Sequence, residues 1–143
     1  MANSDTSNTS KTSTYGAGIY SKNSESFSLS DSTFSLMNFA EYGGAIYLES
    51  DTKTSIPTTA SHSISNTTFS GNIAYQGGAI YVKEIDYLSI SNTTITQNSV
   101  TTSTAGVQGK GGAIYYSSSS NFNRSYFSFI LPSFIHLKLN TIK

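Results

Sequence analysis

The sequence predicts an all-β chain wound as a solenoid, in which the short strands of successive coils stack on one another. Two repeated segments predict this fold. The pentapeptide Gly-Gly-Ala-Ile-Tyr begins at residues 43, 77 and 111, and a related segment begins at residue 16. A second segment alternates large and small residues up to an Asn or Asp, and begins at residues 27, 62 and 88. Alternation is the period of a β-strand, and repetition on this scale is typical of stacked repeats.

The composition agrees with a folded, weakly charged chain. Charged residues make up 11% of it, while 36% are hydrophobic and 13% aromatic. Eight basic and eight acidic residues cancel, so the charge gives no reason to expect a nucleic-acid partner. Without cysteine there is no disulfide and no thiolate chemistry. Residues 1–14 lack the apolar core of a signal peptide, so none is expected in this chain.

The spacing of the repeats locates two insertions. Residues 51–60 and 101–109 each contribute about eight residues that the other copies lack, and without them the unit is about 26 residues long. Both insertions fall between the matched segments. We therefore expect them in turns of a coil that has three short strands, at about 3.3 Å per strand residue.

Stacking places equivalent residues above one another. The Gly pairs are expected to allow a tight bend where a Cβ would not fit. Asp31, Asn66 and Asn92 stand where a sharp bend is expected, and their side chains are expected to form a polar ladder between coils. The predicted apolar columns are Ile19, Ile46, Ile80 and Ile114; Leu29, Ile64 and Ile90; and Phe34, Phe69 and Ile95.

The motifs also resemble a known family. Phe69-Ser70-Gly71-Asn72 followed by Gly77-Gly78-Ala79-Ile80 resembles the Phe-x-x-Asn and Gly-Gly-Ala-Ile motifs of chlamydial polymorphic outer-membrane protein repeats. More broadly, residues 15–117 look like the right-handed parallel β-helix, or pectate-lyase-like, repeats of surface proteins. The resemblance implies a right-handed parallel β-helix of three to four coils. Asn38 lies one residue late, and Ile95 replaces Phe, so the pattern is weaker in those copies.

We expect three regions along the chain. Residues 1–14 are interpreted as a disordered leader or a partial first coil, and residues 15–117 as the β-helix repeats. Residues 118–143 are interpreted as a C-terminal cap or a non-native tail. The apolar stretch in this region is too short to span a bilayer. Four coils are near the lower limit for independent stability, so we expect neighbouring coils from a longer chain.

The tyrosine column is the best candidate for a binding site. If Ile46 points inward, the next residue in the strand points outward, and four phenols would form a flat amphipathic stripe that binds sugar rings or a protein. The same column could instead stabilise coil stacking, and Ala45 and Tyr47 could be the inward pair. The stripe consists of Tyr20, Tyr47, Tyr81 and Tyr115.

The other polar residues favour structural roles. The carboxylates do not recur at one coil position, and Glu49 and Glu84 are interpreted as solvated turn charges. His62 and His136 have no partner at metal-ligand spacing, and His62 is expected to pack in a column with Phe27 and Leu88. The threonine column has only three members and lies beside turns, so it is not expected to bind ice. Four asparagines begin an Asn-x-Ser/Thr glycosylation site: Asn66 and Asn92 are interpreted as structural, and any glycan is expected on Asn8 or Asn123. The other residues of this group are the carboxylates Asp31, Glu41, Asp51 and Asp86, and the column Thr33, Thr68 and Thr94.

These observations predict a non-catalytic module with no cofactor and no bound metal. We expect it to be extracellular or at the cell surface, without a membrane-spanning segment, and to present a repetitive face to glycans or surface proteins. The alternative is the remnant of a polysaccharide-acting lyase or hydrolase. That alternative requires several carboxylates to converge in one groove.

Overall fold

The computed structural model describes residues 13–38, 40–50, 62–85, 87–102, 109–117 and 126–130. These residues form fifteen short strands, and none of them is helical. The described part of the chain therefore contains no helix of the length and apolarity that a bilayer crossing demands. Every strand pair is parallel, as the prediction of stacked coils requires.

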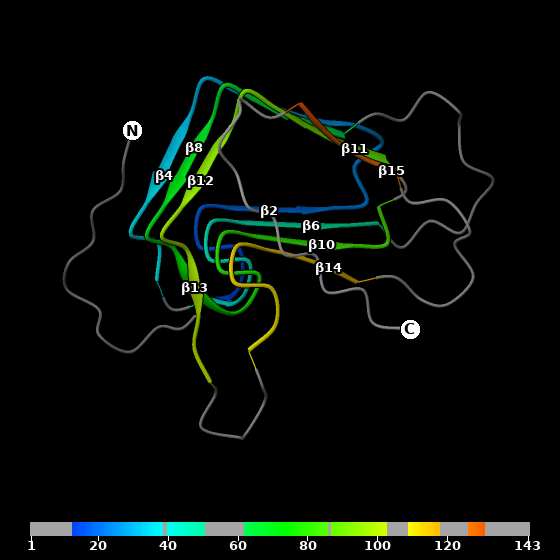
Figure 1. Cartoon of the computed structure of the whole chain (residues 1–143). Coiled ribbons are helices and arrows are strands. Elements are labelled where there is room, and N and C mark those ends of the chain that lie inside the picture. Colours follow the sequence, from blue (N-terminus) through cyan, green and yellow to red (C-terminus); the bar gives the residue numbers. More distant parts are fainter. Residues whose placement is uncertain are drawn as a thin grey trace.

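The strands form four parallel sheets, which we name A to D (Figure 1). Sheet A contains β1 (Ser13–Tyr15), β5 (Ala40–Tyr42), β9 (Ile73–Gln76) and β13 (Ser99–Val100). Sheet B contains β2 (Ile19–Lys22), β6 (Ile46–Glu49), β10 (Ile80–Lys83) and β14 (Ile114–Ser117). Sheet C contains β3 (Phe27–Ser30), β7 (His62–Ser65), β11 (Tyr87–Ser91) and β15 (Tyr126–Ile130). Sheet D contains β4 (Thr33–Ser35), β8 (Thr68–Ser70) and β12 (Thr94–Thr96).

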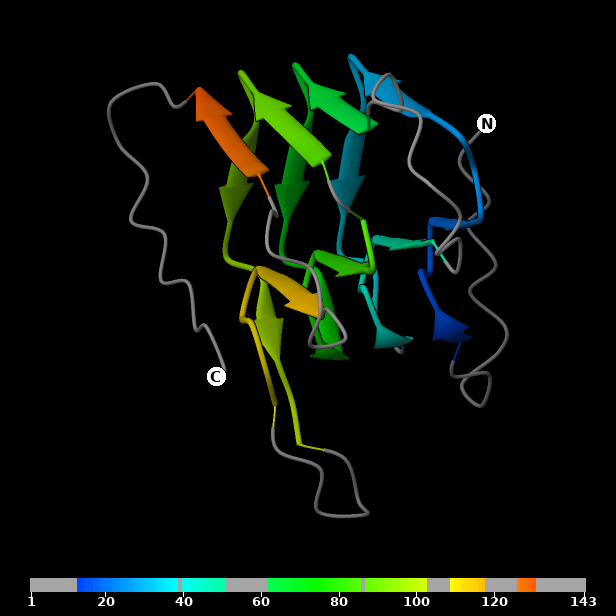
Figure 2. The ribbon, with the colours of Figure 1, turned by 90° about the vertical axis from the view of Figure 1, so that its right-hand side faces the viewer.

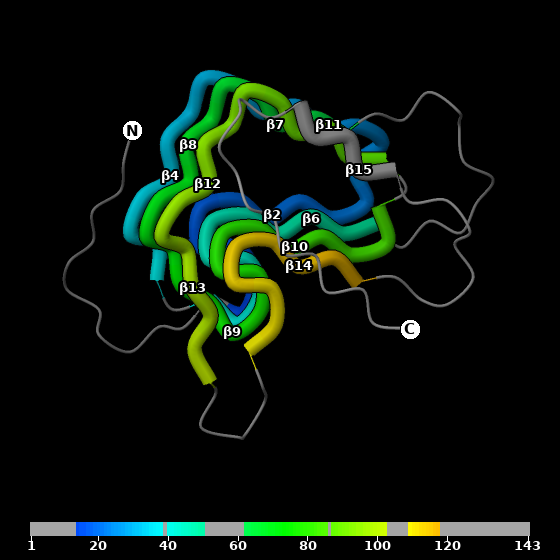
Figure 3. Tube along the Cα trace, viewed as in Figure 1, coloured from blue at the N-terminus to red at the C-terminus, as the bar shows by residue number. Residues whose placement is uncertain are grey.

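The chain visits the sheets in the order B, C, D and A in each coil, and then returns to B. Viewed along the axis, successive coils overlay one another (Figure 3), and from the side the strands of each sheet lie next to each other (Figure 2). The fold is the expected right-handed parallel β-helix. The prediction of three strands per coil is wrong, because Ile73–Gln76 and its equivalents form a fourth strand between the Asn and the Gly pair.

The predicted columns are confirmed by the register of the strands. Ile46 pairs with Ile19 on one side and Ile80 on the other, and Ile80 pairs with Ile114. The two other columns are also in register, through Leu29, Ile64 and Ile90 and through Phe34, Phe69 and Ile95. The insertions therefore fall between β6 and β7 and between β13 and β14, where the sequence placed them.

One apolar core fills the coil. Ile46 and Leu48 of β6 belong to it, together with Ile64 of β7 and Phe69 of β8, and each of these four is at most 1% exposed. Because side chains alternate along a strand, the second and fourth residues of β6 lie on the outer face of sheet B. That outer face carries the candidate site.

The Gly pair behaves as predicted. Gly43 has a φ of 65°, a conformation that residues with a Cβ rarely adopt. At Gly44 there is no space for a larger residue. A Cβ there would lie 2.0 Å from the carbonyl oxygen of Gly78 in the following coil. The pair turns the chain from the end of a sheet A strand into the next strand of sheet B.

The asparagine turns are confirmed in conformation, and the position of the amide ladder is corrected. Asn66 and Asn92 both have a φ of 47° and lie exposed at the bend between sheets C and D. The amide hydrogen bond between coils joins a different pair, Asn72 and Asn98, at the corner between sheets D and A. Asn72 is buried at that corner, and buried amides need hydrogen-bond partners.

The two ends of the described chain extend the stack. β1 pairs with β5, so residues 13–15 belong to a partial first coil. β15 pairs with β11, so residues 126–130 add a strand to sheet C beyond the expected end of the repeats. The rest of the regions 1–14 and 118–143 lies outside the described residues, and their predicted roles as leader, cap or tail stay predictions.

Candidate functional site

The tyrosine column predicted from the sequence is present on sheet B. Tyr47 pairs with Tyr20 and with Tyr81, and Tyr81 pairs with Tyr115. The ring centroids are 5.4 Å apart for Tyr20 and Tyr47, 5.1 Å for Tyr47 and Tyr81, and 5.2 Å for Tyr81 and Tyr115. The central pair is stacked almost parallel, at 6°.

The column is exposed at one end. Tyr20 is 50% exposed, whereas Tyr47 is 3% and Tyr81 is 6% exposed. Tyr115 is partly exposed. Tyr47 lies on the face opposite Ile46, as expected for a strand in which Ile46 points inward. The expectation of four exposed phenols is nevertheless wrong for Tyr47 and Tyr81.

A second tyrosine column explains this burial. Tyr15 and Tyr42, at the ends of β1 and β5, pair in register, and their rings are stacked 5.7 Å apart. The glycine turn brings their rings over sheet B. The ring centroids are 4.7 Å apart for Tyr15 and Tyr47, and 5.1 Å apart for Tyr42 and Tyr81. We name the six residues Tyr15, Tyr20, Tyr42, Tyr47, Tyr81 and Tyr115 the tyrosine cluster.

The second column was not predicted from the sequence, although a signal was available. Tyr15 directly precedes Gly16, as Tyr42 directly precedes Gly43. In the later coils the column continues as Gln76 and then Lys110, so the aromatic identity is lost. The ammonium of Lys110 lies 5.9 Å from the centre of the Tyr115 ring, which allows a cation–π interaction.

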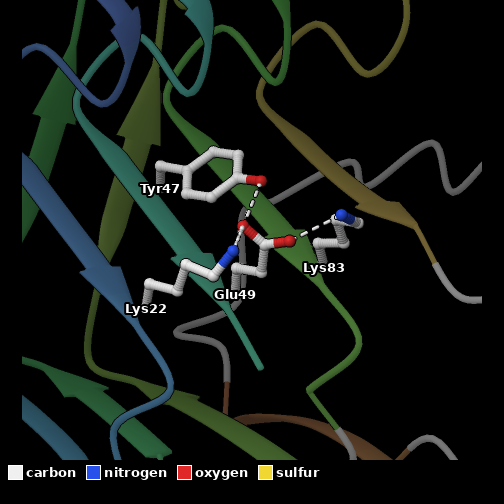
Figure 4. A network of polar contacts seen from close by, with 4 residues as sticks. All are labelled: Lys22, Tyr47, Glu49 and Lys83. Atoms are coloured by element: carbon white, nitrogen blue, oxygen red, sulfur yellow. Dashed lines mark hydrogen bonds and ion pairs between the residues drawn. The ribbon is translucent and has the colours of Figure 1, made fainter. Parts of the chain in front are cut away.

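A charged row borders the cluster on the same face of sheet B (Figure 4). Lys22, Glu49 and Lys83 are paired across β2, β6 and β10. The carboxylate of Glu49 accepts a hydrogen bond from Lys83 at 2.5 Å and lies 3.8 Å from the ammonium of Lys22. It also accepts the hydroxyl of Tyr47 at 2.9 Å.

Glu49 is therefore a buried structural anion. It is 6% exposed, so the interpretation of Glu49 as a solvated turn charge is wrong. A buried carboxylate is tolerated when ion pairs and hydrogen bonds replace its water, and here two cations and one phenol do so. This arrangement links the outer faces of three adjacent coils through ion pairs.

The electrostatics of the cluster follow from burial. Burial raises the pKa of Tyr47 far above its ordinary value, and the hydrogen bond and negative charge of Glu49 raise it further. Burial also raises the pKa of Tyr81, although a hydrogen bond with Ser117 opposes the change. Both phenols stay neutral at physiological pH, and the Tyr47 hydroxyl donates a hydrogen bond to Glu49.

The remaining sequence candidates are mostly scattered. His62 is 7% exposed between Phe27 and Leu88, as predicted, and burial lowers the pKa of its imidazole. The threonine column is in register along sheet D. In the described part of the chain, no three His, Cys, Asp or Glu side chains are grouped so as to hold a metal. Asn8, Asp51, Asp86, Asn123 and His136 lie outside the described residues.

Comparison with known proteins gives one match. Residues 66–83 and 92–117 match the sequence model of the Chlamydia polymorphic membrane protein repeat. No curated protein and no solved structure gives a significant match. Each matched segment begins at the asparagine turn, passes through Asn72 or Asn98 and the Gly pair, and ends in sheet B. Two segments of the chain therefore resemble the Chlamydia polymorphic membrane protein repeat.

Proposed function

We propose that this chain is a non-catalytic module of a surface protein, and that its coils present the outer face of sheet B to glycans or to other proteins. The exposed end of the tyrosine cluster is the contact site in this proposal. The buried members, Tyr47 and Tyr81, have the structural role of fixing the exposed rings in place.

The observation that carries the proposal is the pair of exposed rings at one end of the cluster. Tyr15 is 41% and Tyr20 is 50% exposed, and their ring centroids are 5.3 Å apart. Tyrosine offers an apolar ring and a polar hydroxyl together, which suits the alternating apolar and hydroxyl surfaces of a sugar or a protein. Both rings contact Tyr47. Because they are already held, little side-chain entropy is lost on binding.

Surface location is supported by the matched family, which is named for membrane proteins of Chlamydia. The repeat architecture supports a presenting role as well, since stacked coils generate an extended surface in which equivalent residues recur. Lys22 lies on the same face of β2 as Tyr20, two residues further along the strand. A ligand on the tyrosine pair would therefore meet a cation beside it.

The test is binding of the full chain to a glycan array and to a panel of host-surface proteins, with the double variant Tyr15→Ala/Tyr20→Ala compared beside it. We expect at least a tenfold loss of affinity for any ligand that the wild type binds. Tyr87→Ala is the matched control, because Tyr87 is 41% exposed on β11, away from the cluster.

Circular dichroism shows whether the double variant keeps the fold. We expect that it does, because both side chains lie at the exposed end of the cluster. Unchanged affinity in a folded double variant would contradict the proposed contact site. Equal losses for the double variant and for Tyr87→Ala would place the contact elsewhere on the coil surface.

A further inference from the structure

The two exposed rings of the tyrosine cluster form a reactive pair. Tyr15 ends β1 and Tyr20 lies in β2, so the glycine turn between them brings residues of sheets A and B together. We propose that Tyr15 and Tyr20 are a site of oxidative modification, at which a one-electron oxidant joins the two rings as dityrosine. This inference is independent of ligand binding.

Exposure selects this pair from the cluster. A phenol must be reached by the oxidant, and Tyr15 and Tyr20 are 41% and 50% exposed. Among the ring contacts of the described residues, theirs is the one in which both partners are exposed at this level. The ring of Tyr47 lies closer to that of Tyr15, with centroids 4.7 Å apart, but Tyr47 is 3% exposed and its hydroxyl donates a hydrogen bond to Glu49.

Ring orientation favours the same pair. Dityrosine joins the rings edge to edge, through the carbons next to the two hydroxyl-bearing carbons. Tyr15 and Tyr20 are tilted by 31° with centroids 5.3 Å apart, and their exposed sides leave room for a small rotation. Tyr47 and Tyr81 are stacked face to face at 6° within the cluster, so bringing their edges together would disrupt tightly packed rings.

The reaction balances with two equivalents of oxidant. Each phenol gives one electron to the oxidant, such as the oxidised haem of a peroxidase, and releases its hydroxyl proton to water. The two phenoxyl radicals then couple through one new carbon–carbon bond between ring carbons. The hydrogen displaced from each coupling carbon moves to the oxygen, which restores both phenols. The net change is the loss of two electrons and two protons.

The sequence makes the product easy to identify. Trypsin cleaves after Lys11 and Lys22, so residues 12–22 form one peptide that contains both tyrosines. Coupling of Tyr15 to Tyr20 therefore closes a ring within this peptide, which loses two hydrogens and gives no fragment ions from inside the ring. Coupling to Tyr42 or Tyr47 would instead join it to the peptide of residues 23–53.

The experiment treats the dilute, folded full chain with a haem peroxidase and hydrogen peroxide, and follows dityrosine fluorescence and the tryptic peptides. We expect the internally closed peptide 12–22 to be the main cross-linked product. Tyr20→Phe and Tyr15→Phe should each abolish it, because phenylalanine keeps the ring and forms no phenoxyl radical. Tyr87→Phe, which replaces an equally exposed tyrosine outside the cluster, should leave the yield unchanged.

Two results would overturn the proposal. One is a folded wild-type chain in which Tyr87 or another tyrosine is oxidised while peptide 12–22 stays uncoupled. The other is equal coupling in a synthetic peptide of residues 12–22, because the closeness of the two residues in sequence would then account for the reaction without the fold. The two phenylalanine variants check each other, so misfolding of one leaves the result interpretable.

Discussion

The side-chain amide of Asn72 donates a hydrogen bond to the Oδ1 atom of Asn98, which lies 2.8 Å away in the next coil. The same oxygen accepts the backbone N–H of Asn72 at 2.9 Å, and the amide of Asn98 donates to the carbonyl of Phe69. On its other side, Asn72 accepts the backbone N–H of Met37 at 3.0 Å. The side chain of Asn72 therefore links the coil before it to the coil after it.

Asn72→Ala is expected to lower the free energy of unfolding by about 2–4 kcal/mol. Asn72 is 0% exposed, and the variant leaves the N–H of Met37 and the carbonyl of Phe34 without the partner that the asparagine provides. Buried backbone groups that lose their partners carry the full cost of desolvation. Urea unfolding followed by circular dichroism measures the change.

Asn38→Ala is the control, because Asn38 is an exposed asparagine of the preceding coil that lies one position after Met37, the residue equivalent to Asn72. Its removal is expected to change stability by less than about 0.5 kcal/mol. Equal losses in the two variants would show that burial of the amide contributes nothing special at this corner.

Tyr47→Phe is expected to make the chain less sensitive to alkaline pH. The folded-state pKa of Tyr47 lies well above its ordinary value of 10.0, so above that pH the unfolded state has lost a proton that the folded state keeps. Stability contributed by the neutral phenol is therefore complete below pH 10 and declines as the pH rises further. The variant lacks this titration, at a cost of about 1–2 kcal/mol near neutral pH from the lost hydrogen bond to Glu49.

Urea unfolding at a series of pH values from 7 to 11 tests the prediction through the slope of stability against pH. Tyr87→Phe is the control, because it removes an exposed phenol that lies outside the tyrosine cluster. A wild-type slope in Tyr47→Phe would mean that other groups, among them Tyr81, account for the alkaline loss.

Much of the fold was predictable because stacking requires like residues above like. The columns through Ile46, Ile64 and Phe69 followed from counting residues between motifs, and the register confirms them. The fourth strand was not predicted, since Ile73–Gln76 and Ala40–Tyr42 share little sequence. Backbone hydrogen bonds hold these strands together, and this pairing is compatible with many different side chains.

The candidate site was only partly predictable, because burial on the outer face depends on how the chain turns. Alternation placed Tyr47 opposite Ile46 correctly. It could not show that the glycine turn returns Tyr15 and Tyr42 over the same face. The ion pairs of Glu49 could not be predicted either. Lys22 and Lys83 are 61 positions apart in the sequence, and they meet at Glu49 only in the folded stack.

His62→Leu is expected to stabilise the chain at mildly acidic pH relative to the wild type. Burial lowers the pKa of His62 below its ordinary value of 6.5, and a hydrogen bond to the backbone of Ser24 opposes the change only in part. Below pH 6.5 the unfolded state binds the proton first, so wild-type stability declines as the pH falls toward the folded-state pKa. Leucine is already accommodated at the next position of the column, as Leu88.

Urea unfolding at pH 8 and at pH 5 gives the comparison. The difference in unfolding free energy between His62→Leu and the wild type should be more favourable to the variant at pH 5 than at pH 8. If the difference is the same at both values, His62 takes up its proton equally in the folded and unfolded states, and its burial has no acid-sensitive consequence.

Leu36→Gly is expected to stabilise the chain, although it removes an apolar side chain. Leu36 has a φ of 56°, and Gly71 occupies the equivalent turn of the next coil with a φ of 64°. A left-handed conformation costs a residue with a Cβ roughly 1–2 kcal/mol, whereas the extra freedom of glycine in the unfolded chain costs about 0.5–1 kcal/mol. Because Leu36 is 74% exposed, little packing is lost, and a net gain of up to about 1 kcal/mol is expected.

Ser35→Gly separates conformation from glycine's general effect. Ser35 is an exposed residue at the end of β4, one position before Leu36, and its strand conformation gives glycine no advantage. This control should lose about 0.5–1 kcal/mol in the same thermal or urea unfolding experiment. If Leu36→Gly loses as much, the packing of the Leu36 side chain outweighs the backbone strain. Opposite signs in the two variants would instead show that the turn, and not the side chain, sets the stability of this corner.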